Sequence, residues 1–301
     1  MKRNALLIFV LSIAALSGWG QTLRFVSILP STTASGSYTP DGGLALANKY
    51  YFRSSLSSIP LANIFYFYTI SGTRTLVNGS NSLSIGFFKP GTDEEILAGN
   101  GSGLTAKDVL GGAYLTGTAT TTNDDYVDIR VYPGQIAPAL TYTRSFTVSL
   151  YRGLPGTPGT FIRNRTLTVR ATVASQVQIS IGPSGQGYQP NISSHNVDLG
   201  EVSAGASRDF SVYLLANRGY KLTMTVASGG RLHSGTTSDL IPYTLKLNGN
   251  SLTPGTGVVI DQTSTAAVYK KEYIFTVVVP AGADVEAGTY TDTISFSISA
   301  L

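Results

Sequence analysis

The chain has 301 residues, of which only 13% are charged, and it contains 33 glycines, 13 prolines and no cysteine. The absence of cysteine excludes disulfide scaffolds, cysteine-ligated zinc, thiol nucleophiles and lipid attachment through an N-terminal cysteine. The formal net charge of +4 includes Lys2 and Arg3, and without them the excess of basic residues is too small to indicate a nucleic-acid-binding protein. At about 100–200 residues per domain, the length predicts two domains.

Residues 1–20 have the pattern of a secretory signal peptide. Lys2 and Arg3 precede an apolar run over residues 5–15, and small residues, Gly18 and Gly20, stand just before Gln21. A basic start, a short apolar run and small residues at the cut are typical of such leaders. The run is too short to cross a bilayer of about 30 Å as a helix. We therefore predict an exported protein with no membrane span after cleavage; the alternative is an N-terminal membrane anchor.

Beyond residue 20, short runs of alternating apolar and polar residues dominate, and helical periodicity is almost absent. Gly, Pro and Asn turns separate these runs, a pattern typical of sandwiches and barrels. The aromatic run over residues 64–68 suits a central strand. The clearest later runs span residues 141–150, 167–173, 210–214, 221–227, 243–247, 273–279 and 289–300. The predicted fold class is all-β.

The two halves of the chain share an internal similarity. Residues 141–150 (TYTRSFTVSL) align with residues 289–298 (TYTDTISFSI), and residues 131–133 align with residues 278–280 at nearly the same offset upstream. Two matched blocks in register favour a duplication. We therefore predict an N-terminal β-domain over residues 21–165 and a C-terminal β-domain over residues 166–301.

No enzyme signature is present in the chain. His195 and His233 lie far apart and outside any metal-ligand spacing, and there is neither a Gly-x-Ser-x-Gly elbow nor a phosphate-binding glycine loop. Asp124, Asp125 and Asp128 offer oxygen ligands of the kind that Ca²⁺ prefers, but a turn entering a strand explains the same residues. We predict no enzymatic activity, no cofactor and no metal.

The second half carries a series of recognisable motifs. They are NRGYKLT at residues 217–223, SGGRL at 228–232, IPYTL at 241–245 and AGTYTDTI at 287–294. In this order they resemble the spore coat protein U domain, which is also the subunit fold of archaic (Csu-type) chaperone–usher pili. The resemblance covers roughly residues 166–301, and the first half matches only weakly. Many members of the family carry a cysteine near the first strand, which residues 174–181 lack, and this departure points to a divergent branch.

The resemblance implies two tandem immunoglobulin-like β-sandwich domains, the second of which lacks its final strand. A periplasmic chaperone or a neighbouring pilin subunit then supplies that strand, and an outer-membrane usher assembles the fibre. The residues are compatible with this, because one face of the run over residues 289–300 is apolar and no further strand follows before Leu301. An unpaired apolar edge invites strand addition. The predicted acceptor edge comprises Tyr290, Ile294, Phe296, Ile298 and Ala300; the alternative is internal pairing in a complete sandwich.

Two tandem domains of this type resemble the tip subunits of such pili, in which an adhesive domain precedes the pilin domain. A rod subunit would need an N-terminal donor segment of alternating apolar residues, and Ser27 interrupts that alternation in residues 22–29. We therefore interpret residues 22–29 as the first strand of the first domain, with a donor segment as the alternative. The candidate adhesive loops are apolar and uncharged: Ile136, Ala137, Pro138, Ala139 and Leu140, and Ala113, Tyr114 and Leu115.

The sequence thus favours a secreted, non-enzymatic adhesive subunit of a bacterial surface pilus, which passes through the periplasm to the cell surface. Its surface or host ligand stays open. One alternative is a free-standing spore-coat-like or cell-envelope structural protein. Another is a secreted carbohydrate-binding module, which the loss of Trp19, the only tryptophan, with the leader makes less favourable.

Overall fold

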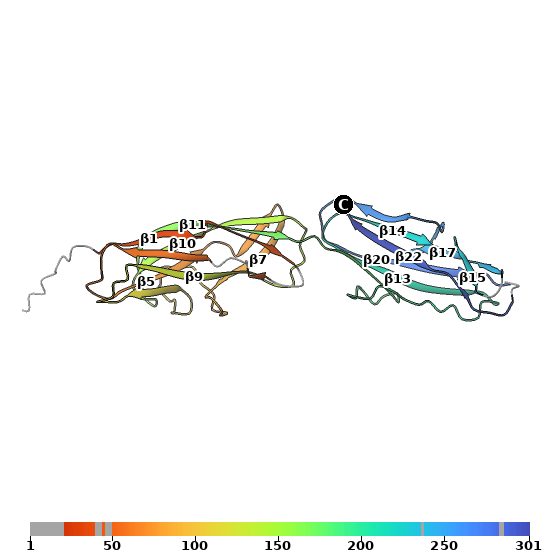
Figure 1. Cartoon of the computed structure of the whole chain (residues 1–301), viewed down its shortest axis with the longest axis horizontal. Helices are drawn as coiled ribbons and strands as arrows, with labels where there is room; N and C mark the ends of the chain where they lie inside the picture. The colour runs from red at the N-terminus through yellow and green to blue at the C-terminus, as the bar shows by residue number, and fades with distance from the viewer. Residues whose placement is uncertain (1–20, 40–43, 46–49, 236–237, 283–285) are drawn as a thin grey trace, which may run out of the picture.

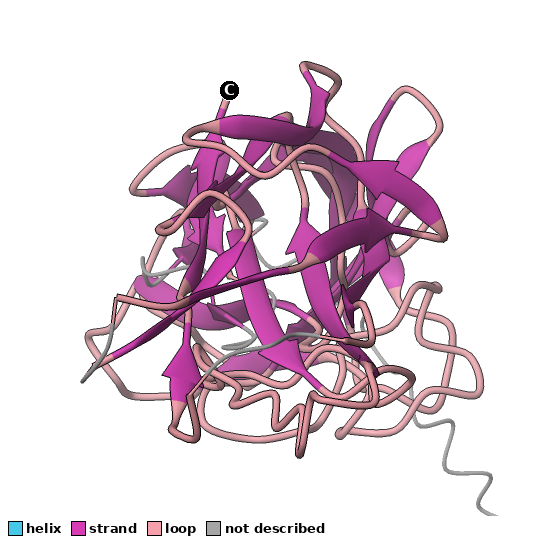
Figure 2. Cartoon of the chain, turned by 90° about the vertical axis from the view of Figure 1, so that its right-hand side faces the viewer, coloured by secondary structure: helices cyan, strands magenta, loops and turns pink. Residues whose placement is uncertain are grey.

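A computed structural model describes residues 21–39, 44–45, 50–235, 238–282 and 286–301, so the predicted signal peptide lies outside the described residues. The described residues form strands, turns and loops without any helix, which confirms the all-β prediction (Figure 2). They build two tandem immunoglobulin-like β-sandwich units that follow one another along the long axis of the molecule (Figure 1). No helix long and apolar enough to cross a membrane occurs among these residues.

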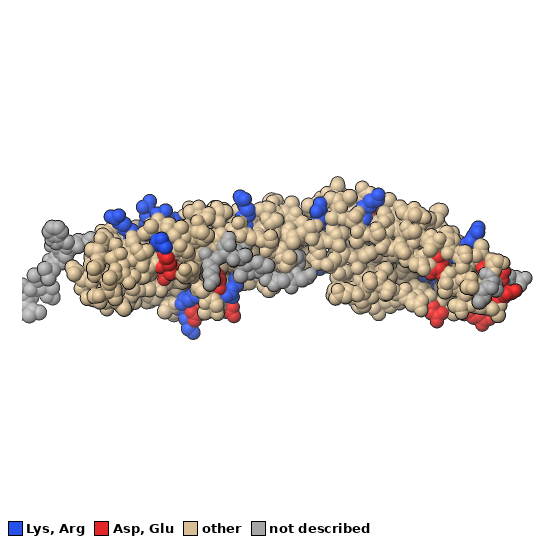
Figure 3. Space-filling model, viewed as in Figure 1, with Lys and Arg blue, Asp and Glu red and all other residues tan. Residues whose placement is uncertain are grey.

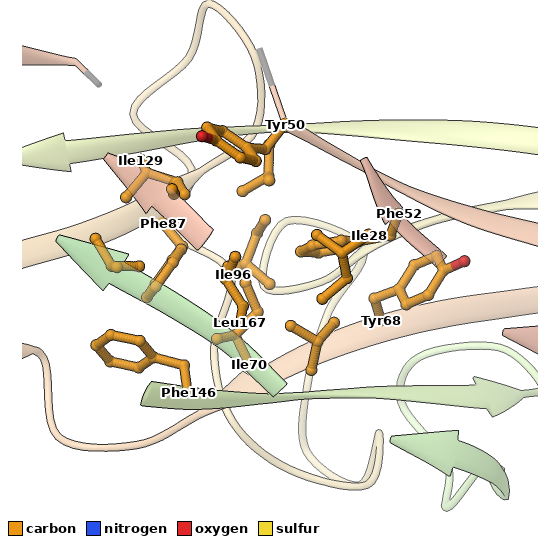
Figure 4. Close-up of a cluster of buried hydrophobic side chains, with 14 of the residues drawn as sticks. Ile28, Tyr50, Phe52, Tyr68, Ile70, Phe87, Ile96, Ile129, Phe146 and Leu167 are labelled. Carbon is orange, nitrogen blue, oxygen red and sulfur yellow. The ribbon is translucent and has the colours of Figure 1, made fainter. Parts of the chain in front are cut away.

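The first unit is a network of eleven hydrogen-bonded strands, whose main path runs β1-β4-β9-β7-β6-β10-β11-β2. The strands are β1 (Leu23–Leu29), β2 (Thr33–Tyr38), β3 (Leu44–Ala45), β4 (Tyr50–Leu56), β5 (Ile64–Ser71), β6 (Thr75–Asn78), β7 (Asn81–Phe88), β8 (Leu110–Tyr114), β9 (Thr122–Val131), β10 (Thr141–Arg152) and β11 (Thr160–Val173). They surround one apolar core, part of which is drawn in Figure 4. The alternating pattern explains this packing: β10 buries Tyr142, Phe146, Val148 and Leu150 and turns its serines and threonines outward.

β1 belongs to this core. Leu23, Phe25 and Ile28 are buried in it, and β1 pairs antiparallel with β4. Residues 22–29 are therefore the first strand of the first unit, as the interrupted alternation predicted.

The second unit contains three small sheets, with strand orders β12-β13-β20-β17-β18, β19-β14-β22 and β16-β15-β21. Its strands are β12 (Val177–Gly182), β13 (Ala206–Ala216), β14 (Tyr220–Val226), β15 (Arg231–Ser234), β16 (Leu240–Pro242), β17 (Thr244–Leu247), β18 (Asn250–Leu252), β19 (Val258–Thr263), β20 (Tyr269–Val279), β21 (Tyr290–Thr291) and β22 (Ile294–Ala300). A second apolar core lies among these strands.

The boundary between the units differs from the predicted one. The predicted division at residues 165 and 166 cuts β11, which continues to Val173 and pairs with β10 and β2 of the first unit. A strand of fourteen residues keeps its alternation across the point where the duplicated blocks suggested a break, so the pattern did not mark it. We place the boundary at residues 174–176, which connect β11 to β12.

Asn217 forms hydrogen bonds with this connection. Its side chain is buried, donates a hydrogen bond from Nδ2 to the Ala174 carbonyl (2.8 Å) and accepts one from the Gln176 amide (2.7 Å). The Asn217 carbonyl accepts a further bond from the amide of Ala139 in the first unit (2.7 Å). The connection is therefore short and held by hydrogen bonds on both sides.

Candidate functional site

The strands β10 and β22, which contain parts of the two similar sequence blocks, differ in their neighbours. β10 pairs with β11 along one edge and with β5 and β6 along the other. β22 pairs with β14 along one edge, and no described strand occupies its other edge. The second unit therefore lacks, among its described residues, a counterpart of β11.

A cavity of about 460 Å³ lies at this open edge. One wall is the start of β22, residues 292–296, and the opposite wall is formed by Ile181 and by residues 193–197 and 199. The remaining lining comes from side chains of the apolar core, namely Phe210, Leu232, Tyr243 and Val277. We call this feature the acceptor groove.

The apolar side chains along the groove are only partly buried. Among the residues that the structure describes, the first core contains 31 buried side chains and two partly buried ones, whereas the second contains 16 buried and 16 partly buried ones. The partly buried set includes the inward side chains of the two strands nearest the groove, Val177, Ile179 and Ile181 of β12 and Ile294, Phe296 and Ile298 of β22. Because a complete sandwich buries its inward positions, these residues indicate a core that is open on one side.

The opposite wall of the groove takes no part in a backbone ladder. Within residues 193–201, no described residue takes part in a backbone–backbone hydrogen bond. Val197 and Leu199, two positions apart, nevertheless pack against the core. A segment without ladder partners therefore lies across the groove from the start of β22.

The polar groups at the groove have local structural roles. Asp292 accepts hydrogen bonds from the Tyr243 hydroxyl (2.8 Å) and from the Ser228 amide (3.1 Å), and these bonds position the start of β22. Burial, reinforced by this carboxylate, raises the pKa of Tyr243 above its ordinary value. His195 lines the groove and is exposed.

Two of the five predicted acceptor residues, Ile294 and Phe296, line the groove, and Ile298 packs against the same core. Ile294, Phe296 and Ile298 project from the same face of β22, and the Phe296 ring contacts the rings of Phe210 and Phe275 at centroid distances of 6.2 and 4.9 Å. Tyr290 lies apart in β21, which pairs with β15. Ala300 is exposed at the end of β22.

The opposite wall was not predicted. Its only sequence signal is the spacing of Val197 and Leu199, which is too short to stand out in a segment rich in polar residues.

The two predicted adhesive loops lie in different places. The loop of residues 136–140 lies at the junction of the units, where the Ala139 amide donates a hydrogen bond to the Asn217 carbonyl. Ala137 is buried, Leu140 packs partly against the first core, and the Pro138 carbonyl accepts a hydrogen bond from the Tyr142 hydroxyl. Ile136 is exposed. In the second, Ala113 pairs with Phe65 inside the sheet, Tyr114 is buried, and only Leu115 is exposed.

Leu115 belongs to a group of exposed apolar residues at the end of the first unit that lies away from the second. Loops of residues 57–63, 115–121 and 153–159 meet there. The Leu56 amide bonds to the Thr121 carbonyl, the Thr116 amide to Asn63 Oδ1, and the Gly153 amide to the Phe65 carbonyl. The loops expose Ile59 (54%), Leu61 (78%), Leu115 (50%) and Leu154 (53%). We call these four residues the distal surface.

The acidic residues of β9 are engaged with other groups. Asp124 pairs with Arg53 through two hydrogen bonds of 2.6 and 2.7 Å, and Asp128 accepts a bond from Arg130. Asp125 accepts a hydrogen bond from the Tyr66 hydroxyl (2.8 Å), and burial raises the pKa of Asp125 to about 6. The described residues contain no group of three or more acidic or histidine side chains placed to hold a metal ion.

Comparisons with known proteins were made at the levels of family, sequence and structure. No protein-family model matches the chain, the spore coat protein U domain included, and no curated protein matches it either. Among solved structures, a chain of the CsuC–CsuE chaperone–tip adhesion subunit pre-assembly complex of Acinetobacter baumannii is 14% identical, with a TM-score of 0.47; the alignment covers 90% of this chain and 99% of that one. The CupB6 tip adhesin of Pseudomonas aeruginosa is 14% identical, with a TM-score of 0.35 and coverage of 94% and 91%. The adhesive subunit CfaE of enterotoxigenic Escherichia coli is 12% identical, with a TM-score of 0.36 and coverage of 89% and 92%. Because the identities and TM-scores are low, we draw the functional argument from the geometry of this chain.

Proposed function

We propose that the chain is a secreted adhesive subunit of a bacterial surface fibre, and that its second unit accepts a β-strand from another protein. The observation that carries the proposal is the acceptor groove, in which the open edge of β22 and a segment without ladder partners lie across from each other beside partly buried apolar side chains. An added strand would pair the open backbone edge through main-chain hydrogen bonds, and its alternate side chains would cover the partly buried apolar residues.

The first unit supplies the expected geometry of the added strand. There β11 runs antiparallel to β10 and parallel to β2. By the duplication, a strand added to the second unit runs antiparallel to β22. Its inward side chains take the place that Leu167, Val169, Ala171 and Val173 take in the first core. β12 lies close beside β22 without pairing with it, so full seating of the strand requires these two strands to separate.

The partners that we propose are those implied by the resemblance to archaic pilus subunits. A periplasmic chaperone protects the apolar groove during export, an outer-membrane usher exchanges the chaperone for the next subunit, and a pilin segment fills the groove permanently. The unit at the opposite end then forms the tip of the fibre at the cell surface. Its distal surface contacts the target, since burial of exposed apolar area contributes about 25 cal/mol per Å².

A fusion tests the acceptor groove. A turn followed by the sequence of residues 166–173 is added after Leu301, and the control fusion carries serine at the four inward positions. We expect the apolar fusion to raise the melting temperature of the second unit by more than about 5 °C, because several kcal/mol of burial are gained and each kcal/mol shifts melting by about 4–8 °C. We also expect slower hydrogen exchange in β22. Equal melting and exchange in the two fusions would refute strand acceptance and favour a complete sandwich in a cell-envelope structural protein.

Adhesion is tested separately at the distal surface. We expect the combined variant Ile59→Ser, Leu61→Ser, Leu115→Ser and Leu154→Ser to show reduced adsorption of the full chain to an apolar surface. Serine at Ile136, an exposed apolar residue of the junction loop, serves as the matched control. An equal loss in the control, or no loss in either variant, assigns adhesion to another surface.

A further inference from the structure

Three strands of the first unit carry a set of arginines without acidic neighbours in the same strands. The arginines are Arg24 of β1, Arg144 and Arg152 of β10, and Arg163, Arg165 and Arg170 of β11. These strands and the adjoining β2 contain no aspartate, glutamate or lysine. Arg144 pairs with the buried Val169, and Arg170 lies on the opposite face of β11 from Arg163 and Arg165. We therefore reserve the name arginine face for the remaining four residues, Arg24, Arg152, Arg163 and Arg165.

The charge of this face is not neutralised within the described residues. Four other cations of the first unit have acidic partners: Arg53 with Asp124, Arg74 with Glu95, Lys89 with Glu94, and Arg130 with Asp93 and Asp128. No described carboxylate lies within 4.0 Å of any arginine of the face. Figure 3 shows basic side chains along the upper edge of the first unit, where no acidic ones are seen, and a mixture of acidic and basic side chains below them.

These four arginines lie at the far part of β1, β10 and β11. Arg165 donates hydrogen bonds from Nε and Nη2 to the Phe25 carbonyl, at 3.2 and 3.1 Å, which places it beside β1 and next to Arg24. Arg163 lies two positions along the same strand, about 7 Å away. Leu150 of β10 pairs with Arg163, and Arg152 pairs with Thr160. Arg152 therefore lies beyond Arg163 along the same pair of strands, on the side away from Arg165. The cations therefore form a row.

We propose that the arginine face binds a linear acidic polysaccharide. Guanidinium groups match carboxylates and sulfates with two parallel hydrogen bonds, which the ammonium group of lysine does not do. A row of cations suits charges repeated along a polymer. A bilayer fits less well, because it is a plane and needs basic residues spread over a flat contact. Nucleic acid also fits less well, because Phe161 is the only exposed aromatic ring described on these three strands for stacking with bases.

This inference is independent of strand acceptance by the second unit. It gives the first unit a polar binding mode beside the apolar distal surface, on a side wall of the same sandwich.

The test uses the full chain without its leader and two labelled probes, heparin for sulfates and alginate for carboxylates. The triple variant Arg24→Gln, Arg152→Gln and Arg163→Gln removes three exposed cations and leaves Arg165, which packs on Phe25, in place. The control variant Arg231→Gln, Lys246→Gln and Lys270→Gln removes the same charge from the second unit. Circular dichroism and melting confirm that both variants fold.

We expect the parent and the control to bind at least one probe with an affinity that falls as salt rises. The triple variant then binds at least about tenfold more weakly, since each lost charge-assisted hydrogen bond carries that much affinity. Equal weakening of the control would reduce the effect to net charge and overturn the proposal. Absence of binding to both polysaccharides, or tighter binding to duplex DNA or to phosphatidylglycerol vesicles at the same salt, would overturn it as well.

Discussion

Substitution of Asp125 by asparagine should stabilise the first unit at neutral pH. The Asp125 carboxylate lies beneath the far end of that unit, where it accepts a hydrogen bond from the Tyr66 hydroxyl (2.8 Å). The groups around it are hydroxyls: Ser54 and Tyr114 bond to each other, and the buried Tyr68 hydroxyl has no partner among the described residues. The neighbouring carboxylate of Asp124 is already paired with Arg53.

The magnitude follows from the pKa of the carboxyl group. Burial raises the pKa of Asp125 from 3.8 to about 6, against the opposing effect of the Tyr66 hydrogen bond. A shift of about two units corresponds to roughly 3 kcal/mol. Because the folded-state pKa is the higher one, the folded protein holds its proton where the unfolded chain has lost it. Stability therefore falls as the pH rises from about 4 to about 6, and the full penalty is present at pH 7.

The assay is calorimetric melting of the full chain at pH 7.5 and pH 4, with the transition of the first unit followed separately because a two-unit protein need not unfold in one step. We expect Asp125→Asn to be more stable than the parent by roughly 1 to 3 kcal/mol at pH 7.5 and nearly equal at pH 4, since the amide oxygen still accepts the Tyr66 bond. Asp124→Asn is the matched control with the opposite sign, because the hydrogen bond from Arg53 lowers the pKa of Asp124. A destabilised Asp125→Asn at pH 7.5, or a difference that does not change with pH, would refute the reasoning.

Three further substitutions test other buried polar contacts. Arg74→Met should lower the melting temperature of the first unit strongly, because Arg74 donates to the carbonyls of Ile70 and Ile96 and each buried carbonyl left without a partner costs about 1–3 kcal/mol; urea unfolding measures the loss. Asp261→Asn should reduce the loss of stability of the second unit in acid. Burial opposes the ionised carboxylate, but hydrogen bonds from Lys271, Tyr220 and Tyr273 lower the pKa of Asp261, so the stabilisation from this carboxylate is present at neutral pH and lost in acid. Melting temperatures of the two proteins from pH 7 to pH 2 measure the difference. Asn217→Ala should speed proteolytic cleavage at residues 174–176, whereas an unchanged cleavage rate would mean that the backbone bonds alone hold the junction.

Local patterns in the sequence were sufficient for the all-β class, for many of the longer strands and for part of one wall of the groove. Alternation with a period of two assigns each residue of a strand to one of two faces, and it therefore placed Ile294, Phe296 and Ile298 on one inward face. The block of residues 141–150 lies within the single strand β10, whereas the similar block of residues 289–298 covers β21, a break and the first part of β22. The incomplete alternation around Ser27 assigned residues 22–29 to the first core, where β1 lies.

Only the tertiary structure decided which strands are neighbours. Tyr290 has the same parity as Ile294, but the residues between them break the strand, and Tyr290 pairs with β15 instead. The loop at residues 136–140 is apolar because it packs at the junction beside Asn217, which no local pattern distinguishes from an exposed apolar loop. The opposite wall of the groove, the meeting of the distal loops and the unpaired state of the arginine face depend in the same way on residues far apart in the chain. The physical reason is that periodicity reports the face on which a side chain lies, whereas the partner of an edge or of a charge is set by long-range packing.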